Sequence, residues 1–307
     1  MRDFPSCFGE NGVQVADASC SSVVGSKSSH NCVSCVYKCK LLDKSCLVTI
    51  VWSKNLMGHC LSVEIYDSSH GFICKVDVKF SLFSKRKGLK NLQVNSSKIE
   101  VFWDLSLAKF GSGPGSGSGA EPMEGYYIAL VCKKEMVLVI GDLRKEAFKK
   151  AGAIASFSNT MFISKRENVF GKRVFVTKAQ FCDNGKIHDL KIECDTSCSD
   201  DPCLLVHIDA KVVMKVKHLR WKFRGNCSIL VGGIQVEVFW DVHNWLFGSS
   251  LGNAVFMFQT SSSMEKLCAG PSVDDSSAFS WKFSESLKES KYSDVGFSLF
   301  LYCWKNE

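Results

Sequence analysis

The sequence has no apolar run that approaches the ~20 residues needed for a helix to cross a bilayer. Its first residues, from Met1 to Ser6, lack a basic stretch followed by an apolar one. The second residue is Arg2, where N-myristoylation requires a glycine. We therefore expect no transmembrane segment, export signal or acyl anchor. Without export, the 16 cysteines are expected to be reduced thiols in the cytosol or nucleus.

Motifs for catalysis are also missing. The sequence has no Gly-x-Ser-x-Gly nucleophile elbow and no glycine-rich phosphate loop between a strand and a helix. Its seven histidines are scattered, and the close pairs His188-Asp189 and Asp241-Val242-His243 resemble surface or capping pairs more than catalytic dyads. We predict that the protein is not an enzyme and needs no cofactor.

Two groups of cysteines are spaced closely enough to suggest a metal site: Cys32, Cys35 and Cys39, and Cys194, Cys198 and Cys203 near His188. Zinc sites normally combine two close-spaced pairs of ligands on tight turns. Cys35 and Cys39 fall on one expected strand, where four positions span about 13 Å. That distance is too long for one ion, so we predict no metal site.

An internal repeat is the clearest positive feature. Residues 99–105, IEVFWDL, recur at 236–242 as VEVFWDV, so that Trp103 and Trp240 stand 137 residues apart (240 − 103). The alignment continues without a gap from Gly88 against Gly225 to Ser112 against Ser249, with ten of 25 positions identical. Such similarity at a fixed spacing indicates a tandem duplication.

Apolar residues make up 46% of the chain and charged residues 22%, a composition typical of a globular protein with a sizeable core. In both halves, apolar residues recur at every second position in short runs rich in Val, Ile, Phe and Trp, which predicts β-strands. The strands expected in the first half are 33–41, 46–52, 61–66, 72–80, 99–105, 126–132 and 136–140. Those expected in the second half are 174–181, 190–194, 203–208, 212–223, 228–231, 236–242, 254–259 and 297–304.

We therefore predict an all-β protein built from two tandem homologous, antiparallel, sandwich-like halves. One short helix is expected between them at residues 142–151, with Asp142 as its N-cap. Strands followed by one helix also occur in pleckstrin-homology-like barrels, which remain the alternative.

The halves are expected at residues 30–155 and 156–307, after an N-terminal arm at 1–29 that is predicted to be disordered. The first half contains a Gly/Ser loop at 111–119. The second contains a polar insert at 260–294, in which Trp281 and Phe283 are candidates to pin the insert to the body.

Long strings along the chain carry a family resemblance, among them FPSCFGENGVQVAD, WSKNLMG, GDLRKEAFKK, AQFCDNGKIHDL, LRWKFRGN, VEVFWDVHNWLFG and NAVFMFQT. They resemble the plant family known as domain of unknown function 868 over nearly the whole chain. The Gly/Ser loop departs from that resemblance because it is longer than the corresponding family stretch. The resemblance implies a plant protein and brings no catalytic residue, ligand or fold with it.

Basic residues provide the leading candidate site, because the net charge of +7 is concentrated in two places. In the expected strand at 212–223, Leu219, Trp221 and Phe223 share one face and the neighbouring cations share the other. Such a row attracts phosphate groups on lipids or nucleic acid. The candidate anion-binding residues are Lys85, Arg86, Lys87, Arg220, Lys222 and Arg224, with Lys165, Arg166, Lys172 and Arg173 as an extension.

A second candidate ligand site comprises Asp241, His243, Asn244 and Trp245, because the second copy has His-Asn-Trp where the first has Ser106-Leu107-Ala108. Polar and aromatic residues gained by one copy favour a ligand-binding loop. The repeated Trp103 and Trp240 are instead expected in the core.

The predicted function is a non-catalytic binding module for an anionic membrane surface or an acidic protein, with nucleic acid a weaker candidate. The alternative is a carbohydrate-binding or hydrolytic β-sandwich that uses the His243 region. The expected location is cytoplasmic, at the membrane periphery or in the nucleus.

Overall fold

The computed structural model describes residues 31–67, 71–80, 86–94, 97–111, 119–155, 160–182, 185–195, 202–248, 252–260 and 296–305. These residues form twenty strands and two helices. The predicted N-terminal arm, the Gly/Ser loop from 112 to 118, and the polar insert from 261 onward lie outside the described residues.

The first half contains two antiparallel meanders of four strands each. One consists of β1 (Asn31–Leu41), β2 (Lys44–Asn55), β3 (Gly58–Asp67) and β4 (Phe72–Phe80). The other consists of β5 (Lys87–Val94), β6 (Ser97–Asp104), β9 (Tyr127–Cys132) and β10 (Glu135–Gly141). The smaller elements are β7 (Lys109–Phe110), β8 (Pro122–Glu124), α1 (Arg144–Ala151) and β11 (Ile154–Ala155).

The second half begins with the long strand β12 (Met161–Gly171) and continues with two more meanders. The first comprises β13 (Val174–Gln180), β14 (Ile187–Asp195), β15 (Cys203–Ile208) and β16 (Lys211–Val216). The second comprises β17 (Arg224–Val231), β18 (Ile234–Asp241), β19 (Asn253–Thr260) and β20 (Ser298–Lys305). The short helix α2 (His243–Phe247) follows β18.

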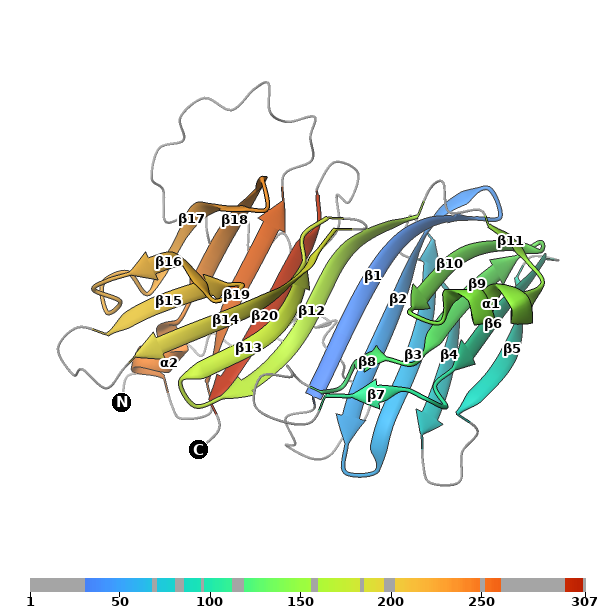
Figure 1. Cartoon of the computed structure of the whole chain (residues 1–307), viewed down its shortest axis with the longest axis horizontal. Coiled ribbons are helices and arrows are strands. Elements are labelled where there is room, and N and C mark those ends of the chain that lie inside the picture. The colour runs from blue at the N-terminus through green and yellow to red at the C-terminus, as the bar shows by residue number, and fades with distance from the viewer. Residues whose placement is uncertain are drawn as a thin grey trace, which may run out of the picture.

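Strand β12 joins meanders from both halves into one nine-stranded sheet, in the order β17-β18-β19-β20-β12-β1-β2-β3-β4 (Figure 1). It pairs antiparallel with β1 and parallel with β20. Two smaller sheets complete the layers, one of five strands (β11-β10-β9-β6-β5) and one of four (β13-β14-β15-β16).

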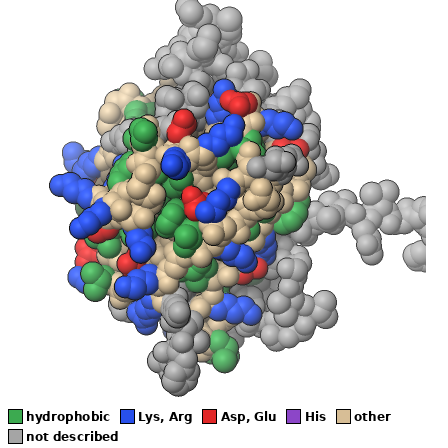
Figure 2. All heavy atoms as spheres, turned by 90° about the vertical axis from the view of Figure 1, so that its right-hand side faces the viewer, with side chains coloured by type: hydrophobic (Ala, Val, Ile, Leu, Met, Phe, Trp, Pro, Cys, Tyr) green, Lys and Arg blue, Asp and Glu red, His purple; other side chains and the backbone are tan. Residues whose placement is uncertain are grey.

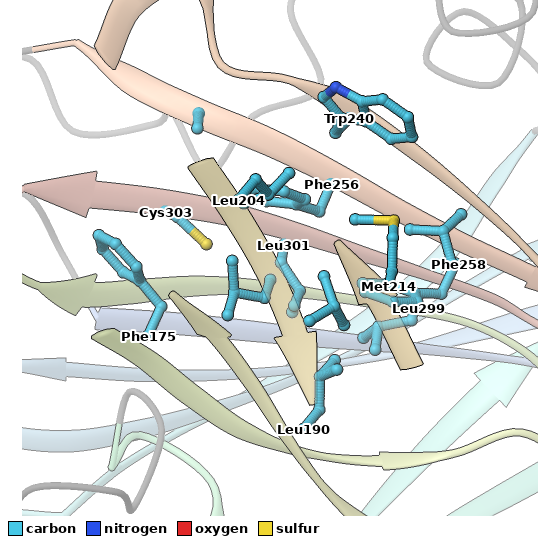
Figure 3. Close-up of a cluster of buried hydrophobic side chains, with 14 of the residues drawn as sticks. Phe175, Leu190, Leu204, Met214, Trp240, Phe256, Phe258, Leu299, Leu301 and Cys303 are labelled. Atoms are coloured by element: carbon cyan, nitrogen blue, oxygen red, sulfur yellow. The ribbon is translucent and has the colours of Figure 1, made fainter. Parts of the chain in front are cut away.

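Each smaller sheet covers one half of the large sheet and encloses a separate hydrophobic core. The first core lies between β1–β4 and the β6, β9 and β10 strands. The second lies between β13–β16 and β17–β20, where Phe256, Phe258, Leu299 and Leu301 meet Leu190 and Leu204 (Figure 3). Helix α1 covers the outer face of the five-stranded sheet through Ala147.

Alternation explains how the strands build these cores. In β2, Cys46, Val48, Ile50 and Trp52 are each at most 2% exposed, while the residues between them are more accessible. Successive strand residues point to opposite faces, so this pattern buries one face of the sheet. The prediction of an all-β fold is confirmed.

The barrel alternative is wrong for the part of the chain that the structure describes. The large sheet ends at β17 and β4, and the smaller sheets likewise have free edges, so none of them closes. The sequence pattern also missed five strands: β5, β12 and the short β7, β8 and β11. β5 is an edge strand with no buried residue, and the centre of β12 is charged.

Asp142 does not cap α1 as predicted. The helix begins at Arg144 with Leu143 at the N-cap position and no capping side chain. The carboxylate of Asp142 instead accepts hydrogen bonds from the backbone N–H groups of Gly125 (2.8 Å) and Tyr126 (3.1 Å). These two donors lower the pKa of Asp142 and hold the turn that leads into β9.

The repeated sequence has similar local geometry at its two occurrences. A Cβ atom added to Gly88 would lie 2.5 Å from Cζ2 of Trp103, and one added to Gly225 would lie 2.5 Å from Cζ2 of Trp240. Each glycine therefore leaves room for the indole of the residue opposite it on the next strand. Trp240 is buried in the second core, and Trp103 packs against the first core partly buried.

We predict that Trp240→Ala lowers the free energy of unfolding by about 3–5 kcal/mol, because it empties a large aromatic site in the core. Trp221→Ala is the matched control, since Trp240 is 6% exposed and Trp221 is 87% exposed. The control should change stability by less than about 0.5 kcal/mol in denaturant melts. Equal effects of the two substitutions would contradict the placement of Trp240.

Candidate functional site

The basic row expected on a strand at residues 212–223 lies in a turn. β16 ends at Val216, β17 starts at Arg224, and His218 adopts a positive φ of 56° between them. The prediction that Leu219, Trp221 and Phe223 share one buried face is therefore wrong. Leu219 is fully buried in the second core, whereas Trp221 is 87% exposed.

Backbone and side-chain hydrogen bonds hold this turn in place. The N–H groups of Trp221 and Lys222 both donate to the carbonyl of His218 (2.9 and 3.0 Å). The N–H of Leu219 donates to the carbonyl of Pro202 (3.1 Å), and Nε1 of Trp240 donates to the carbonyl of Lys222 (3.0 Å). The turn is thus tied to the core at several points, and its tip presents Arg220, Trp221 and Lys222 to solvent.

Arg224, unlike Arg220 and Lys222, is engaged by neighbouring side chains. Its Nε donates to Oδ2 of Asp241 across the β17–β18 pair at 2.8 Å, and its guanidinium lies 5.6 Å from the ring centroid of Phe223. Oδ1 of Asp241 accepts a hydrogen bond from the N–H of His243 (3.0 Å), as Asp104 does from Ser106 in the first half (2.9 Å). Arg224 and Asp241 therefore stabilise the strand end.

The structure does not bring the residues of the second predicted site together on one surface. That site comprised Asp241, His243, Asn244 and Trp245. Trp245 is buried, stacks on Phe175 with centroids 4.7 Å apart, and donates from Nε1 to the carbonyl of Cys303 (3.0 Å). Asn244 is exposed, and His243 lies edge-on to Phe223 at the surface. Trp245 therefore belongs to the core rather than to a ligand platform.

More cations lie at the same end of the second half. Lys217 follows β16, Lys172 and Arg173 form the β12–β13 turn, and Lys305 ends β20 with Nζ 3.2 Å from the carbonyl of Trp245. Two carboxylates described at this end are engaged: Asp241 by Arg224, and Glu193 by Lys191 and His207. We call Lys217, Arg220, Trp221 and Lys222 the cationic turn.

The basic residues of the first half lie elsewhere. Arg86 and Lys87 are exposed at the start of β5, and Lys85 lies outside the described residues. β5 is the edge of the five-stranded sheet, at the opposite end of the molecule from β17 (Figure 1). Figure 2 shows this end, where Lys and Arg side chains are interspersed with acidic and apolar ones. The two basic stretches therefore do not form one surface.

Lys165, predicted to extend the basic surface, lies between the two cores. Its ammonium is 2.9 Å from Oε2 of Glu121 and 3.5 Å from Oε2 of Glu167, and its side chain is 13% exposed. Glu167 also accepts a hydrogen bond from Thr177 of β13, so segments of both halves, residue 121 before β8 and strand β13, contribute to the group. Burial alone would lower the pKa of Lys165, and the two carboxylates raise it above its ordinary value. We call Glu121, Lys165 and Glu167 the seam cluster.

Arg166 points to the other face of β12. Its guanidinium lies 5.4 Å from the ring centroid of Phe300, and its Nε is buried without a hydrogen bond. Ser164 Oγ and Trp304 Nε1 on the same face are also buried and unsatisfied. Arg166 is therefore no part of the solvent-facing basic surface.

The cysteines show no arrangement for a metal in the described part of the chain. Cys32, Cys35, Cys39, Cys194 and Cys203 form no disulfide there, and no three His, Cys, Asp or Glu side chains in that part are grouped as metal ligands. Cys198 lies outside the described residues. Burial, followed by the charge of Glu121, raises the pKa of Cys35 well above its usual value, which keeps this thiol protonated.

Neither described helix is long and apolar enough to cross a membrane.

A model of a plant protein family of unknown function, DUF868, matches residues 28–305 of the chain. The match includes every strand and helix described above. The chain has no match among the curated proteins or among the solved structures.

The seam cluster gives a stability prediction. Lys165→Met should lower the free energy of unfolding by about 3–5 kcal/mol, because Glu121 and Glu167 then remain between the cores without their cation. Lys172→Met, at an exposed lysine, should have an effect below about 0.5 kcal/mol.

A triple variant, Lys165→Met with Glu121→Gln and Glu167→Gln, should recover much of the loss because it leaves no unpaired charge. Denaturant melts of the three variants measure these effects. If Lys165→Met costs no more than Lys172→Met, the seam cluster does not stabilise the fold.

Proposed function

The chain belongs to the plant family DUF868, whose function is unknown, and from its surface we propose a non-catalytic module that binds a polyanionic surface or an acidic partner through the cationic turn. The observation that supports this proposal most is the exposure of the three cations in the turn. Lys217, Arg220 and Lys222 are exposed, and none of them has an ion pair within the described residues. They are free to meet external negative charge.

The surroundings of the turn support the proposal. Arg224 neutralises Asp241, so this neighbouring carboxylate does not compete for the three free cations. Lys172 and Arg173 add positive charge at the same end. Clustered charge of one sign raises the local concentration of anionic partners and accelerates their association. The hydrogen-bonded backbone reduces the ordering cost of binding.

The rival function, a carbohydrate-binding or hydrolytic site around His243, has weaker support. Trp245 is buried, so it offers no ring face to a sugar. Both carboxylate oxygens of Asp241 are already engaged, one by Arg224 and one by the backbone of His243. Asp241 therefore has no unengaged oxygen with which to orient His243 as a general base.

We also propose that the chain arose by tandem duplication, with halves at residues 30–155 and 156–307. The bounds of β17 and β18 fall 137 residues after those of β5 and β6 (224 − 87 and 234 − 97). The identical residues and the two glycine–tryptophan contacts support the same origin.

A cytoplasmic protein that attaches at the membrane periphery fits the proposed binding of an anionic surface.

The proposed function predicts the effect of removing charge. Lys217→Gln, Arg220→Gln and Lys222→Gln together should weaken binding to vesicles containing anionic phospholipid by roughly 100-fold, at about 1 kcal/mol for each cation near the surface. Wild-type binding should fall as salt rises, because salt screens this attraction. Vesicle co-sedimentation at two salt concentrations measures both effects.

The matched control is Lys145→Gln, Lys149→Gln and Lys150→Gln on α1, which removes the same charge from exposed sites elsewhere. It should bind nearly as well as the wild type. Equal losses in the two triple variants would mean that net charge, rather than the cationic turn, is responsible.

A further inference from the structure

We infer that the partner of the cationic turn is a phospholipid bilayer and that Trp221 is the side chain that enters its interface. This inference rests on the proposed function and specifies its partner. Exposed cations alone would suit any polyanion. The additional observation is the indole between two of them, which is 87% exposed.

An indole this exposed is unusual for a residue of its size, because burying a large apolar side chain normally contributes about 1.5–3 kcal/mol. The neighbouring apolar residue Leu219 follows the ordinary rule and is fully buried. The turn thus separates two apolar side chains, one directed into the core and one into solvent. A bilayer interface would remove much of the Trp221 ring from water while leaving its N–H near polar headgroups.

The order cation, tryptophan, cation also matches the chemistry of that interface. Arg220 and Lys222 flank Trp221 and are available to lipid phosphates at the depth where tryptophan rings sit. Phe247, 53% exposed and packed edge-on to Phe223 with centroids 5.7 Å apart, adds apolar surface at the same end. Charge attraction and apolar contact therefore act together there.

The shape of the site favours a bilayer over nucleic acid. Proteins that bind single-stranded nucleic acid combine a basic groove with several aromatic rings on which successive bases stack. Here a single ring, that of Trp221, is exposed at the tip of a hydrogen-bonded turn. The next aromatic residue, Phe223, already contacts Arg224, His243 and Phe247. A projecting tip fits a planar, deformable surface.

The test uses the full chain with three probes: phosphatidylcholine vesicles, the same vesicles containing phosphatidylserine, and a single-stranded oligonucleotide. Trp221→Ala should weaken binding to the phosphatidylserine vesicles roughly tenfold or more. Leu56→Ala, at a fully exposed apolar residue in the β2–β3 turn, is the matched control and should not weaken it. Both variants should melt like the wild type, because neither residue is buried.

Brominated lipids give a second readout that does not depend on affinity. Insertion predicts that they quench wild-type tryptophan fluorescence and that Trp221→Phe loses most of this quenching while still binding vesicles. Quenching that is unchanged in Trp221→Phe would overturn the inference.

The remaining outcomes separate this inference from the proposed function. If vesicle binding is salt-sensitive and unaffected by Trp221→Ala, the anionic-surface function stands and the insertion of Trp221 is wrong. If the oligonucleotide binds and the vesicles do not, the bilayer is the wrong partner while a polyanion remains the right class. Failure to bind either polyanion, even at low salt, would contradict the bilayer partner and leave the proposed function with an acidic protein alone.

Discussion

The architecture depends on the double pairing of β12. This strand forms antiparallel hydrogen bonds with β1 and parallel hydrogen bonds with β20, so that strands from both halves belong to one sheet. It also lies where the two cores meet, since Phe162 of β12 packs against both of them. Lys165 and Glu167 therefore lie between two hydrophobic regions, and Glu121 is a second carboxylate that pairs with Lys165. Buried charges of this kind tolerate few alternative arrangements, because an unpaired charge at such a position is costly.

The same separation between engaged cations and exposed, unpaired ones underlies the proposed binding surface. Lys165 is held between carboxylates, Arg166 lies over Phe300, and Arg224 is paired with Asp241. The cations of the cationic turn have no such partners among the described residues. Net charge by itself therefore says little about where an anion binds. The placement of each cation relative to the sheet decides whether it stabilises the fold or meets a partner.

Sequence alternation predicted strands such as β2 and β3 because each buries one face. It missed β12, whose central Lys165, Arg166 and Glu167 resemble a solvated segment until the distant Glu121 is placed beside them. It also carried one strand through residues 217–223, where the apolar and polar residues still alternate. His218 turns the chain there, so Leu219 and Trp221 point to different surroundings. That turn depends on the contacts of Leu219 with the second core and of Trp240 with Lys222, which no local pattern contains.

Hydrogen exchange of the β12 amides tests the central claim most directly. If β12 unites the two halves, its amides should exchange as slowly as those of β1 and β20, because all three strands then open together. Mass spectrometry of peptides covering residues 161–171 would measure this protection. Rapid exchange in β12 while β1–β4 and β17–β20 stay protected would contradict the claim, since the halves would then be stable without their shared strand.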